Sequence, residues 1–273
     1  MFGVVLCESS RADFGAFFLA SFTYLDMCGH ATIGLAVTLD AMGLIAADVR
    51  GRARFTLEVP AGIITVEARY EEGRIAAVTF DNVPAFVAAK HVATCKVGPD
   101  GQPITVDIAY GGNWYALVEA RAAGVDLTPS GTGHAMSLGA QLKTALNARI
   151  AEGDIEGVHE PLDSILFWRT EQEAGVLVSR QLVVMESIKF DRSPCGTGTS
   201  ARLAQMMGNG TLEPGQQILS RNVMGVDFVA SARPIEDQPG RVQPTVAGTA
   251  HITGYHTFLL STDDPLPDGF LCR

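Results

Sequence analysis

Two of the five cysteines stand in matching surroundings, and their spacing is the strongest chemical signal in the sequence. Cys28 begins the run Cys-Gly-His-Ala-Thr and Cys195 begins Cys-Gly-Thr-Gly-Thr, so both read Cys-Gly-x-x-Thr at the start of a predicted helix. An isolated cysteine is more often a small buried apolar residue. We interpret Cys7 and Cys95 as strand or core residues and Cys272 as a tail residue, because none has this context. The repetition favours a chemical role for the matched pair.

A cysteine at a helix N-terminus lies beside unpaired backbone N–H groups and the positive end of the helix dipole. This position lowers the thiol pKa below the ~8.5 of a free cysteine and favours an accessible thiolate. The same N–H groups bind carboxylates, and the glycine after each cysteine lets an anion approach the backbone. Two such thiols facing each other predict proton transfer on opposite faces of one carbon. One thiolate would remove a proton and the opposite thiol would deliver another, which inverts the configuration.

The elements that must position these cysteines are mostly strands. Alternating patterns predict strands over 54–59, 63–68, 74–80, 104–108 and 114–118, with a turn at 60–62. Strand after strand without intervening helices favours antiparallel sheets over a βαβ array. Helices are expected over 29–43 and 197–208, the first apolar around nearly its whole circumference and therefore buried, and over 134–150, amphipathic and on the surface. We therefore expect two strand-rich units, each holding a buried helix tipped by a cysteine.

The composition excludes several classes of protein. The chain has 273 residues, of which 47% are hydrophobic, so it can form one large or two ordinary domains and is not disordered as a whole. A net charge of −10 without a basic run argues against nucleic acid and anionic membranes as partners. The sequence has no run near the ~20 apolar residues of a membrane span and no signal-peptide features at its start. We expect a cytoplasmic protein with free thiols.

A dinucleotide site is one alternative that the sequence formally offers, since Gly196-x-Gly198-x-x-Ala201 matches the Rossmann fingerprint. That pattern alone is a weak signal, and it should directly follow a strand. Here Pro194 interrupts the run before it, and the sheet is not predicted to be of the βαβ type.

A metal site is a second alternative, suggested by Cys28-x-His30. Zinc needs three or four ligands with recognisable spacing, and the remaining histidines do not supply them. We therefore expect no metal ligands. The other histidines are expected on the surface, at His91 and His134, or in strands near the C-terminal end, at His251 and His256.

Longer segments around both cysteines resemble the two signatures of the proline racemase family: residues 191–200 (DRSPCGTGTS) and 27–34 (MCGHATIG). Residues 110–113 (YGGN), 253–258 (TGYHTF) and Asp264-Pro265 are also similar to the family, so the resemblance covers essentially the whole chain. It implies an α+β, diaminopimelate-epimerase-like fold. Such a fold has two pseudo-symmetric domains, each with a barrel-like, mostly antiparallel sheet around a central helix, and binds substrate between them. The resemblance implies a first domain of residues 1–88 plus about 258–273, N-terminally incomplete, and a second of residues 89–257.

The resemblance also implies catalysis without a cofactor and assigns roles to individual residues. Cys28 and Cys195 take the two acid/base roles, and the other assigned residues bind substrate: Gly29, Gly196 and Thr197 at the carboxylate, His30 and Asp191 near the ring nitrogen, and Phe18 as a pocket aromatic. Each of the last three also has a structural interpretation. Asp191 precedes Ser-Pro and suits a turn or cap, His30 suits a cap or the core, and Phe18 suits the core of an apolar strand.

Within the family, both cysteines are present here, whereas dehydratases usually lack one of them. We therefore expect a racemase or epimerase acting on proline or 4-hydroxyproline, with a small-molecule substrate as partner, and we allow for a homodimer. Two alternatives stay open: a trans-3-hydroxyproline dehydratase, or a catalytically impaired binding homologue. The second arises because family members usually carry about sixty more residues before Met1, and a shortened first barrel would expose strand edges and apolar surface.

Overall fold

The computed structural model of the chain describes residues 2–20, 23–96, 101–186 and 189–266. Cys272, and the predicted contribution of residues 267–273 to the first domain, lie outside the described residues. The helices are α1 (Gly29–Ala41), η2 (Pro129–Gly131, 3-10), α2 (Thr132–Ala151) and α3 (Gly196–Gly208). The strands are β1 (Phe2–Cys7), β2 (Phe14–Ala20), β3 (Tyr24–Leu25), β4 (Arg52–Val59), β5 (Gly62–Glu71), β6 (Arg74–Asp81), β7 (Ala85–Lys96), β8 (Pro103–Tyr110), β9 (Trp114–Glu119), β10 (Ser164–Glu173), β11 (Val176–Glu186), β12 (Lys189–Phe190), β13 (Ile218–Arg221), β14 (Asp227–Pro234) and β15 (Arg241–Gly248).

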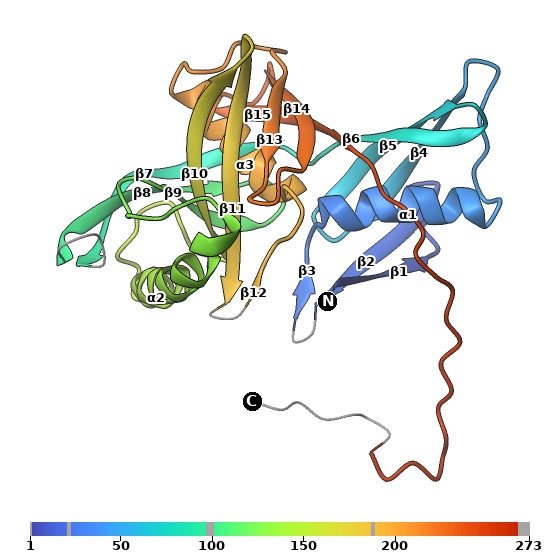
Figure 1. Cartoon of the computed structure of the whole chain (residues 1–273), viewed down its shortest axis with the longest axis horizontal. Coiled ribbons are helices and arrows are strands. Elements are labelled where there is room, and N and C mark those ends of the chain that lie inside the picture. Colours follow the sequence, from blue (N-terminus) through green and yellow to red (C-terminus); the bar gives the residue numbers. More distant parts are fainter. Residues whose placement is uncertain (1, 21–22, 97–100, 187–188, 267–273) are drawn as a thin grey trace.

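Figure 1 shows two lobes, one formed by β1 to β6 with α1 and the other by β7 to β15 with α2 and α3. The described strands nevertheless join in one hydrogen-bonded path, in the order β1-β2-β4-β5-β6-β15-β14-β13-β11-β10-β9-β8-β7. The lobes meet at β15, which pairs with β6 and also with β7. A strand shared by both lobes fixes their relative position, so side chains from the two lobes can be held against each other.

The predicted strands at 54–59, 63–68, 74–80, 104–108 and 114–118 are confirmed, each inside a slightly longer strand. In β4, Phe55, Leu57 and Val59 are buried at alternate positions, as one face on a core requires. The predicted turn is also confirmed, since Val59 pairs with Gly62 across Pro60-Ala61. Gly62 has a φ of 144°, a conformation that glycine adopts readily.

Among the described residues, no α-helix lies between the strands predicted over 54–118, as expected, but the three long helices lie in crossover connections between parallel strands, which the sequence analysis did not predict. The sheet is mostly antiparallel, but β2 pairs with β4, β9 with β10, and β11 with β13 in parallel. Parallel neighbours need a crossover, and α1, α2 and α3 respectively lie within those three connections. The sequence pattern missed this because packing, and not local spacing, decides which strands become neighbours across a helix.

The three helices are buried to different degrees. In α3 every residue from Gly196 to Met206 is buried, and α2 buries one face, with Leu142 and Leu146 at its centre. The prediction of two buried helices therefore holds fully for α3. In α1, Ile33, Ala36 and Leu39 are buried, but the opposite side, including Thr38, reaches solvent. The same core cluster includes residues of α1, α3 and β15, so both cysteine-tipped helices pack on shared apolar side chains.

The segment after β15 passes α1 and then runs away from the body of the molecule (Figure 1). Ala250 still packs on the core, whereas Tyr255 and Phe258 are exposed. The prediction of strand positions for His251 and His256 is wrong, because both lie in this segment, which is not part of the sheet, and both are exposed. His91 and His134 are exposed, as predicted.

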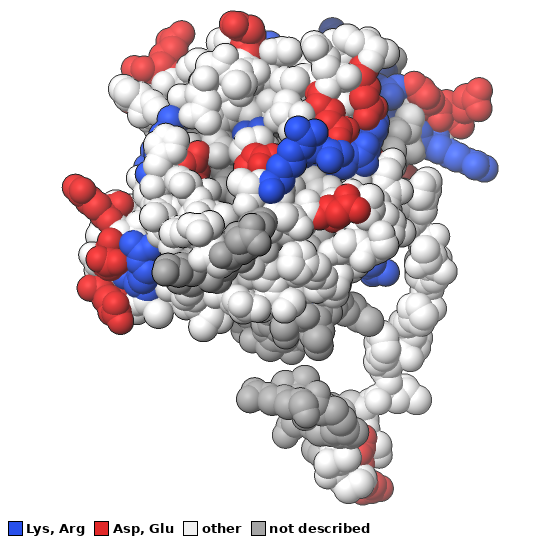
Figure 2. Space-filling view, turned by 60° about the vertical axis from the view of Figure 1, so that its left-hand side comes forward, with Lys and Arg blue, Asp and Glu red and all other residues white. Residues whose placement is uncertain are grey.

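Charges of opposite sign lie beside one another on the face shown in Figure 2, without a large patch of one sign. Ion pairs of this kind join Arg180 to Glu171 and Glu173, and Arg221 to Glu173 and Asp227. Among the described residues, no helix combines the length and apolar character needed to cross a membrane.

Candidate active site

The N-termini of α1 and α3 meet, and this contact brings the two matched cysteines to one cavity. Cys28 is the N-cap of α1 and Cys195 the N-cap of α3. A Cβ atom added to Gly29 would lie 2.8 Å from the Cα atom of Gly196, so these backbones touch as only glycine allows. Beside this contact is a cavity of about 220 Å³ to which both cysteines contribute.

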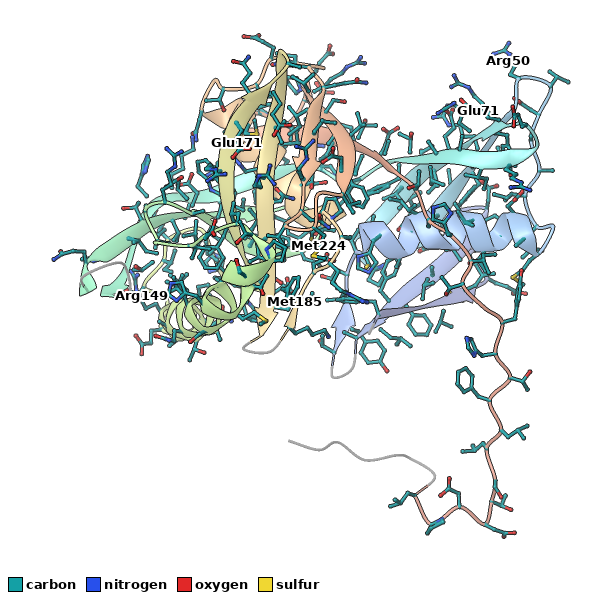
Figure 3. The ribbon with its side chains drawn as sticks, viewed as in Figure 1. Arg50, Glu71, Arg149, Glu171, Met185 and Met224 are labelled. Carbon is teal, nitrogen blue, oxygen red and sulfur yellow. The ribbon has the colours of Figure 1, made fainter. Side chains whose placement is uncertain are left out.

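Both lobes line this cavity. The β2–β3 region and the start of α1 come from one lobe, and β9, α2, the approach to β10, the end of β11 and the start of α3 come from the other. Met185, labelled in Figure 3, lies near the end of β11 and forms part of the wall. The polar and charged lining residues beyond the two cysteines are Thr23, His30, Asn113, Tyr115, Lys143, Asp163, Ser164, Lys189, Asp191 and Thr197.

The Cys28 side of the cavity carries an imidazole and a carboxylate. The Nε2 atom of His30 lies 3.6 Å from the Cys28 sulfur, and its Nδ1 atom lies 3.7 Å from Asp191 Oδ2. The Phe2 ring packs edge-on against the imidazole at 5.0 Å. Burial opposes charge on His30, but Cys28 and Asp191 outweigh it and raise the pKa of His30 well above its ordinary value. Burial also disfavours charge on Asp191, yet His30 and Ser193 lower the pKa of that carboxyl. His30 and Asp191 therefore form an ion pair in the cavity wall.

On the Cys195 side, none of the described residues that contact the sulfur by a hydrogen bond is charged. Cys195 Sγ accepts from the backbone N–H of Gly198 at 3.4 Å, the usual geometry of a side-chain N-cap. The Tyr115 hydroxyl lies 3.4 Å from the same sulfur, and Thr197 Oγ1 lies 3.8 Å away. Burial and then the nearby Asp191 carboxylate raise the pKa of the Cys195 thiol. The predicted lowering of the pKa by the helix N-terminus is therefore wrong for Cys195, because loss of solvation outweighs the N–H contact.

The turn before α3 is held by a chain of local hydrogen bonds. Ser193 N–H donates to Asp191 Oδ1, and Cys195 N–H donates to Ser193 Oγ. The Gln181 amide donates to the carbonyl of Pro194. These contacts keep Cys195 at a φ of 64°, a conformation rare for a residue with a Cβ atom and often found at functional sites.

The structure brings together seven of the eight residues assigned from the sequence: Cys28, Gly29, His30, Asp191, Cys195, Gly196 and Thr197 all line the cavity. Asp191 has both the structural role and the place in the site that the sequence suggested. One carboxylate oxygen caps the turn before α3, and the other faces His30. Phe18 lies elsewhere. Its side chain is fully buried in the core and is not part of the cavity wall, because strand alternation in β2 turns it inward. The aromatic ring beside His30 belongs to Phe2 instead.

Asn113 and Tyr115 are two of the lining residues to which the sequence analysis assigned no role, and both contact the start of α3. The Asn113 amide donates to the carbonyl of Met27 at 2.7 Å and to Thr197 Oγ1 at 3.2 Å, linking the starts of both helices. Tyr115 is 3% exposed, and its hydroxyl lies 2.6 Å from Thr197 Oγ1. The sequence feature that could have identified them is the Gly111-Gly112 pair just before them, because a tight turn fixes the positions of the side chains that follow it.

Two lysines and a further carboxyl complete the lining. Lys143 donates to the carbonyl of Met185, and the Lys189 ammonium lies 5.0 Å from the centre of the Phe2 ring. Burial raises the pKa of Asp163, which accepts the backbone N–H of Trp114. Among the described residues, no group of three or more His, Cys, Asp and Glu side chains is arranged to hold a metal ion.

Comparison with known proteins gives this cavity a family context. The family model described as proline racemase matches residues 1–271. The chain belongs to the proline racemase family. It is 35% identical to a 4-hydroxyproline 2-epimerase of Streptosporangium roseum, over 99% of this chain and 81% of that protein. It is 31% identical to a proline racemase of Clostridioides difficile, over all of this chain and 82% of that protein.

A solved structure of a hydroxyproline epimerase shows the same fold. The hydroxyproline epimerase from Agrobacterium vitis, with bound trans-4-hydroxy-L-proline, superposes with a TM-score of 0.86 at 29% identity, covering 98% of this chain and 77% of that one. The α+β, diaminopimelate-epimerase-like fold predicted from the sequence is confirmed. Because the curated members named above are racemases and epimerases, the chain is an isomerase of this family.

Proposed function

We propose that the chain inverts the α-carbon of proline or 4-hydroxyproline by a cofactor-independent, two-thiol acid/base mechanism. One observation carries the proposal: Cys28 and Cys195 cap two helices whose N-termini meet at one cavity. A carbon held between the two sulfurs would have a proton acceptor on one face and a proton donor on the other. Inversion needs both groups, whereas removal of a proton alone needs one.

The substrate carboxylate would bind at the junction of the two helices. The N–H groups of Gly29, Gly196 and Thr197 lie in the first turns, where no earlier carbonyl of the same helix can accept them. The α-carbon flattens as its proton leaves, and negative charge moves onto the carboxylate. Preorganised N–H donors at the positive ends of two helix dipoles stabilise that charge as it develops. This differential stabilisation of the transition state would make the weakly acidic α-proton removable by a thiolate.

The ring nitrogen of the substrate is cationic when it binds and needs an acceptor. Asp191 supplies a carboxylate in the cavity wall, and His30 lies against it at 3.7 Å. With the carboxylate bound at the helix ends and the nitrogen at Asp191, two fixed points would orient the α-carbon between the sulfurs. Two-point binding of this kind supplies the orientation on which the rate of proton transfer depends.

The two sulfurs have different partners, and this distinguishes their roles in the proposed cycle. The His30 imidazole lies 3.6 Å from the Cys28 sulfur and can exchange a proton with it, so we assign Cys28 the role of the base. Cys195 is buried beside the Asp191 carboxylate, which raises its pKa, so it acts as the thiol that delivers a proton. After one turnover the roles are exchanged, and a molecule of the product configuration can be converted back.

The substrate class is supported by the relatives. Those named above are a 4-hydroxyproline 2-epimerase, a proline racemase and a hydroxyproline epimerase with trans-4-hydroxy-L-proline bound. A cavity of about 220 Å³, with acidic, basic and hydroxyl groups in its wall, suits a small zwitterion.

Isotope exchange tests the proposal directly. The purified chain is incubated in D₂O with L-proline, D-proline, trans-4-hydroxy-L-proline and trans-3-hydroxy-L-proline, and products are separated by chiral chromatography and mass spectrometry. We expect deuterium at the α-carbon of the inverted product from proline or 4-hydroxyproline. Pyrroline formation from the 3-hydroxy compound, faster than either inversion, would replace the proposal with a dehydratase. Binding of these compounds without any exchange would leave only a binding protein.

A further inference from the structure

Tyr115 occupies a position that the two-thiol cycle does not by itself require. Its side chain is 3% exposed in β9, within a small apolar cluster that includes Leu117, Leu166 and Val183. Its hydroxyl nevertheless reaches the Cys195 sulfur at 3.4 Å and lines the cavity. Phenylalanine would fill the same apolar space, so packing alone gives no reason for the hydroxyl.

The hydrogen bonds behind Tyr115 show in which direction the hydroxyl protons can point. The Asn113 amide nitrogen donates to the Met27 backbone carbonyl, and because a carbonyl only accepts, this contact fixes which end of the amide faces Thr197. The same nitrogen lies 3.2 Å from Thr197 Oγ1 and therefore donates to it. The Thr197 hydroxyl can then donate a hydrogen bond to the Tyr115 oxygen at 2.6 Å, and the Tyr115 hydroxyl can donate one to the Cys195 sulfur. Every donor in this chain of contacts then points toward the sulfur.

The chain of hydroxyls also accommodates the protonated sulfur. When Cys195 is a thiol, it can donate to the Tyr115 oxygen, and Tyr115 can donate to Thr197, which still accepts from Asn113. Between the thiolate and thiol states of Cys195, only the hydroxyl hydrogens of Tyr115 and Thr197 rotate, and no heavy atom needs to move. Burial, reinforced by the proximity of Cys195, keeps the pKa of Tyr115 well above its ordinary value, so the phenol stays a donor throughout.

We propose that Tyr115 is a positioning residue whose hydroxyl donates to Cys195 and stabilises the thiolate that forms when Cys195 gives up its proton. The inference rests on the proposed two-thiol function and adds a partner specific to one sulfur. Cys28 has an imidazole that can carry a full positive charge, whereas Cys195 has a neutral phenol and the Gly198 N–H. The charged group that faces Cys195 is Asp191, which opposes a thiolate and is itself paired with His30. Tyr115 thus supplies a donor where the local charge is unfavourable.

Thiol titration by alkylation tests this without requiring turnover. The purified chain and Tyr115→Phe are treated with iodoacetamide over a range of pH, and the alkylation rates of the Cys7, Cys28 and Cys195 peptides are followed by mass spectrometry. A hydrogen bond to a charged group contributes on the order of 1.5–3 kcal/mol, which corresponds to a shift of about one to two pH units. In Tyr115→Phe we expect the midpoint pH of the Cys195 alkylation profile to rise by that amount, while the midpoint for Cys28 stays unchanged. Exposed Cys7 is the internal reference in each sample.

Two controls keep the result interpretable. Tyr110→Phe removes a hydroxyl from the neighbouring strand, where the ring packs on Phe86 and Trp114 rather than on a cysteine, and it should leave both profiles unchanged. Incorporation of 3-fluorotyrosine makes every phenol a stronger donor, and should lower the Cys195 profile in the parent chain but not in Tyr115→Phe. An unmoved Cys195 profile in a folded Tyr115→Phe, or an equal shift of Cys28 and Cys195, overturns the inference. If Cys28→Ser or Cys195→Ser keeps racemase activity, the two-thiol function fails, whereas the alkylation result stands independently.

Loss of this hydrogen bond should also raise the activation barrier for turnover. Tyr115→Phe should therefore reduce kcat/KM by about 10-fold to 100-fold. For interconversion of proline enantiomers the loss must be equal in both directions, because the equilibrium constant is fixed at one. A pH–rate profile displaced in the same sense as the alkylation profile supports the assignment. An unchanged profile with a uniformly lower rate indicates a merely structural role and contradicts it.

Discussion

The contact between Gly29 and Gly196 is the feature that positions both cysteines, and Gly29→Ala tests it most directly. In the native backbone the new Cβ would lie 2.8 Å from Gly196 Cα and 2.9 Å from Phe80 Cζ. Ordinary carbon contacts begin near 3.4 Å, so the start of one helix must move by at least about 0.6 Å. The neighbour on one side is backbone, which cannot rotate away as a flexible side chain could.

The magnitude follows from two opposing effects. Overpacking of a close contact costs about 1–3 kcal/mol. Alanine in place of glycine favours a helix by up to about 1 kcal/mol in the helix interior, and by less at the first residue. The net destabilisation is therefore about 1–2 kcal/mol, and Tm should fall by roughly 2–8 °C for a chain of this size. Displacement of Cys28 relative to Cys195 should also reduce racemisation at least tenfold at temperatures where the protein remains folded, because proton transfer depends steeply on geometry.

Gly34→Ala is the matched control in the same helix. Within the described part of the chain, no heavy atom lies within 4 Å of a Cβ at this position. The substitution should stabilise the protein by about 0.5–1 kcal/mol and leave racemisation unchanged. Calorimetry or circular dichroism gives Tm for both variants, and a polarimetric assay below both transitions gives the rate. If Gly29→Ala and Gly34→Ala raised Tm alike, or if Gly29→Ala kept full activity, the reasoning about the helix junction would be refuted.

Three further outcomes are expected. Cys28→Ser and Cys195→Ser should each abolish racemisation with near-native circular dichroism, because a hydroxyl is far too weakly acidic to replace a thiolate, and substantial activity in either variant contradicts the two-base assignment. Pyrrole-2-carboxylate should inhibit more strongly than a saturated non-substrate of equal size, since its planar ring matches the flattened α-carbon, and equal inhibition constants would count against the planar intermediate. The protonated His30 ring should stabilise the fold fully below a pH of about 6.5, and this contribution should be lost as pH rises through the raised folded pKa. The Tm difference between the parent chain and His30→Gln should therefore be largest near pH 6 and shrink toward pH 9, and a difference that grows with pH would contradict the ion pair with Asp191.

Local patterns in the sequence were enough to predict most of the strands and helices. Alternation over 54–59 and 63–68 predicted β4 and β5 because one face of each strand is buried, and the apolar run after Cys28 predicted α1. The matched Cys-Gly-x-x-Thr runs identified both cysteines as helix caps, since that information lies within a few residues. The parallel pairs β2–β4, β9–β10 and β11–β13 were missed, because which strands become neighbours across a helix is decided by packing.

The tertiary structure alone decided which side chains share the cavity. Phe18 and Phe2 are both aromatic residues of early strands, and only the direction of each strand face places the first in the core and the second beside His30. Tyr115 meets Cys195 across eighty positions of sequence, a contact that no local spacing encodes. The chemical state of Cys195 was likewise set by its surroundings, because the helix N-terminus favours a thiolate and burial beside Asp191 opposes it more strongly. A cap motif is local and can be read from the chain, whereas solvation is a property of everything packed around it.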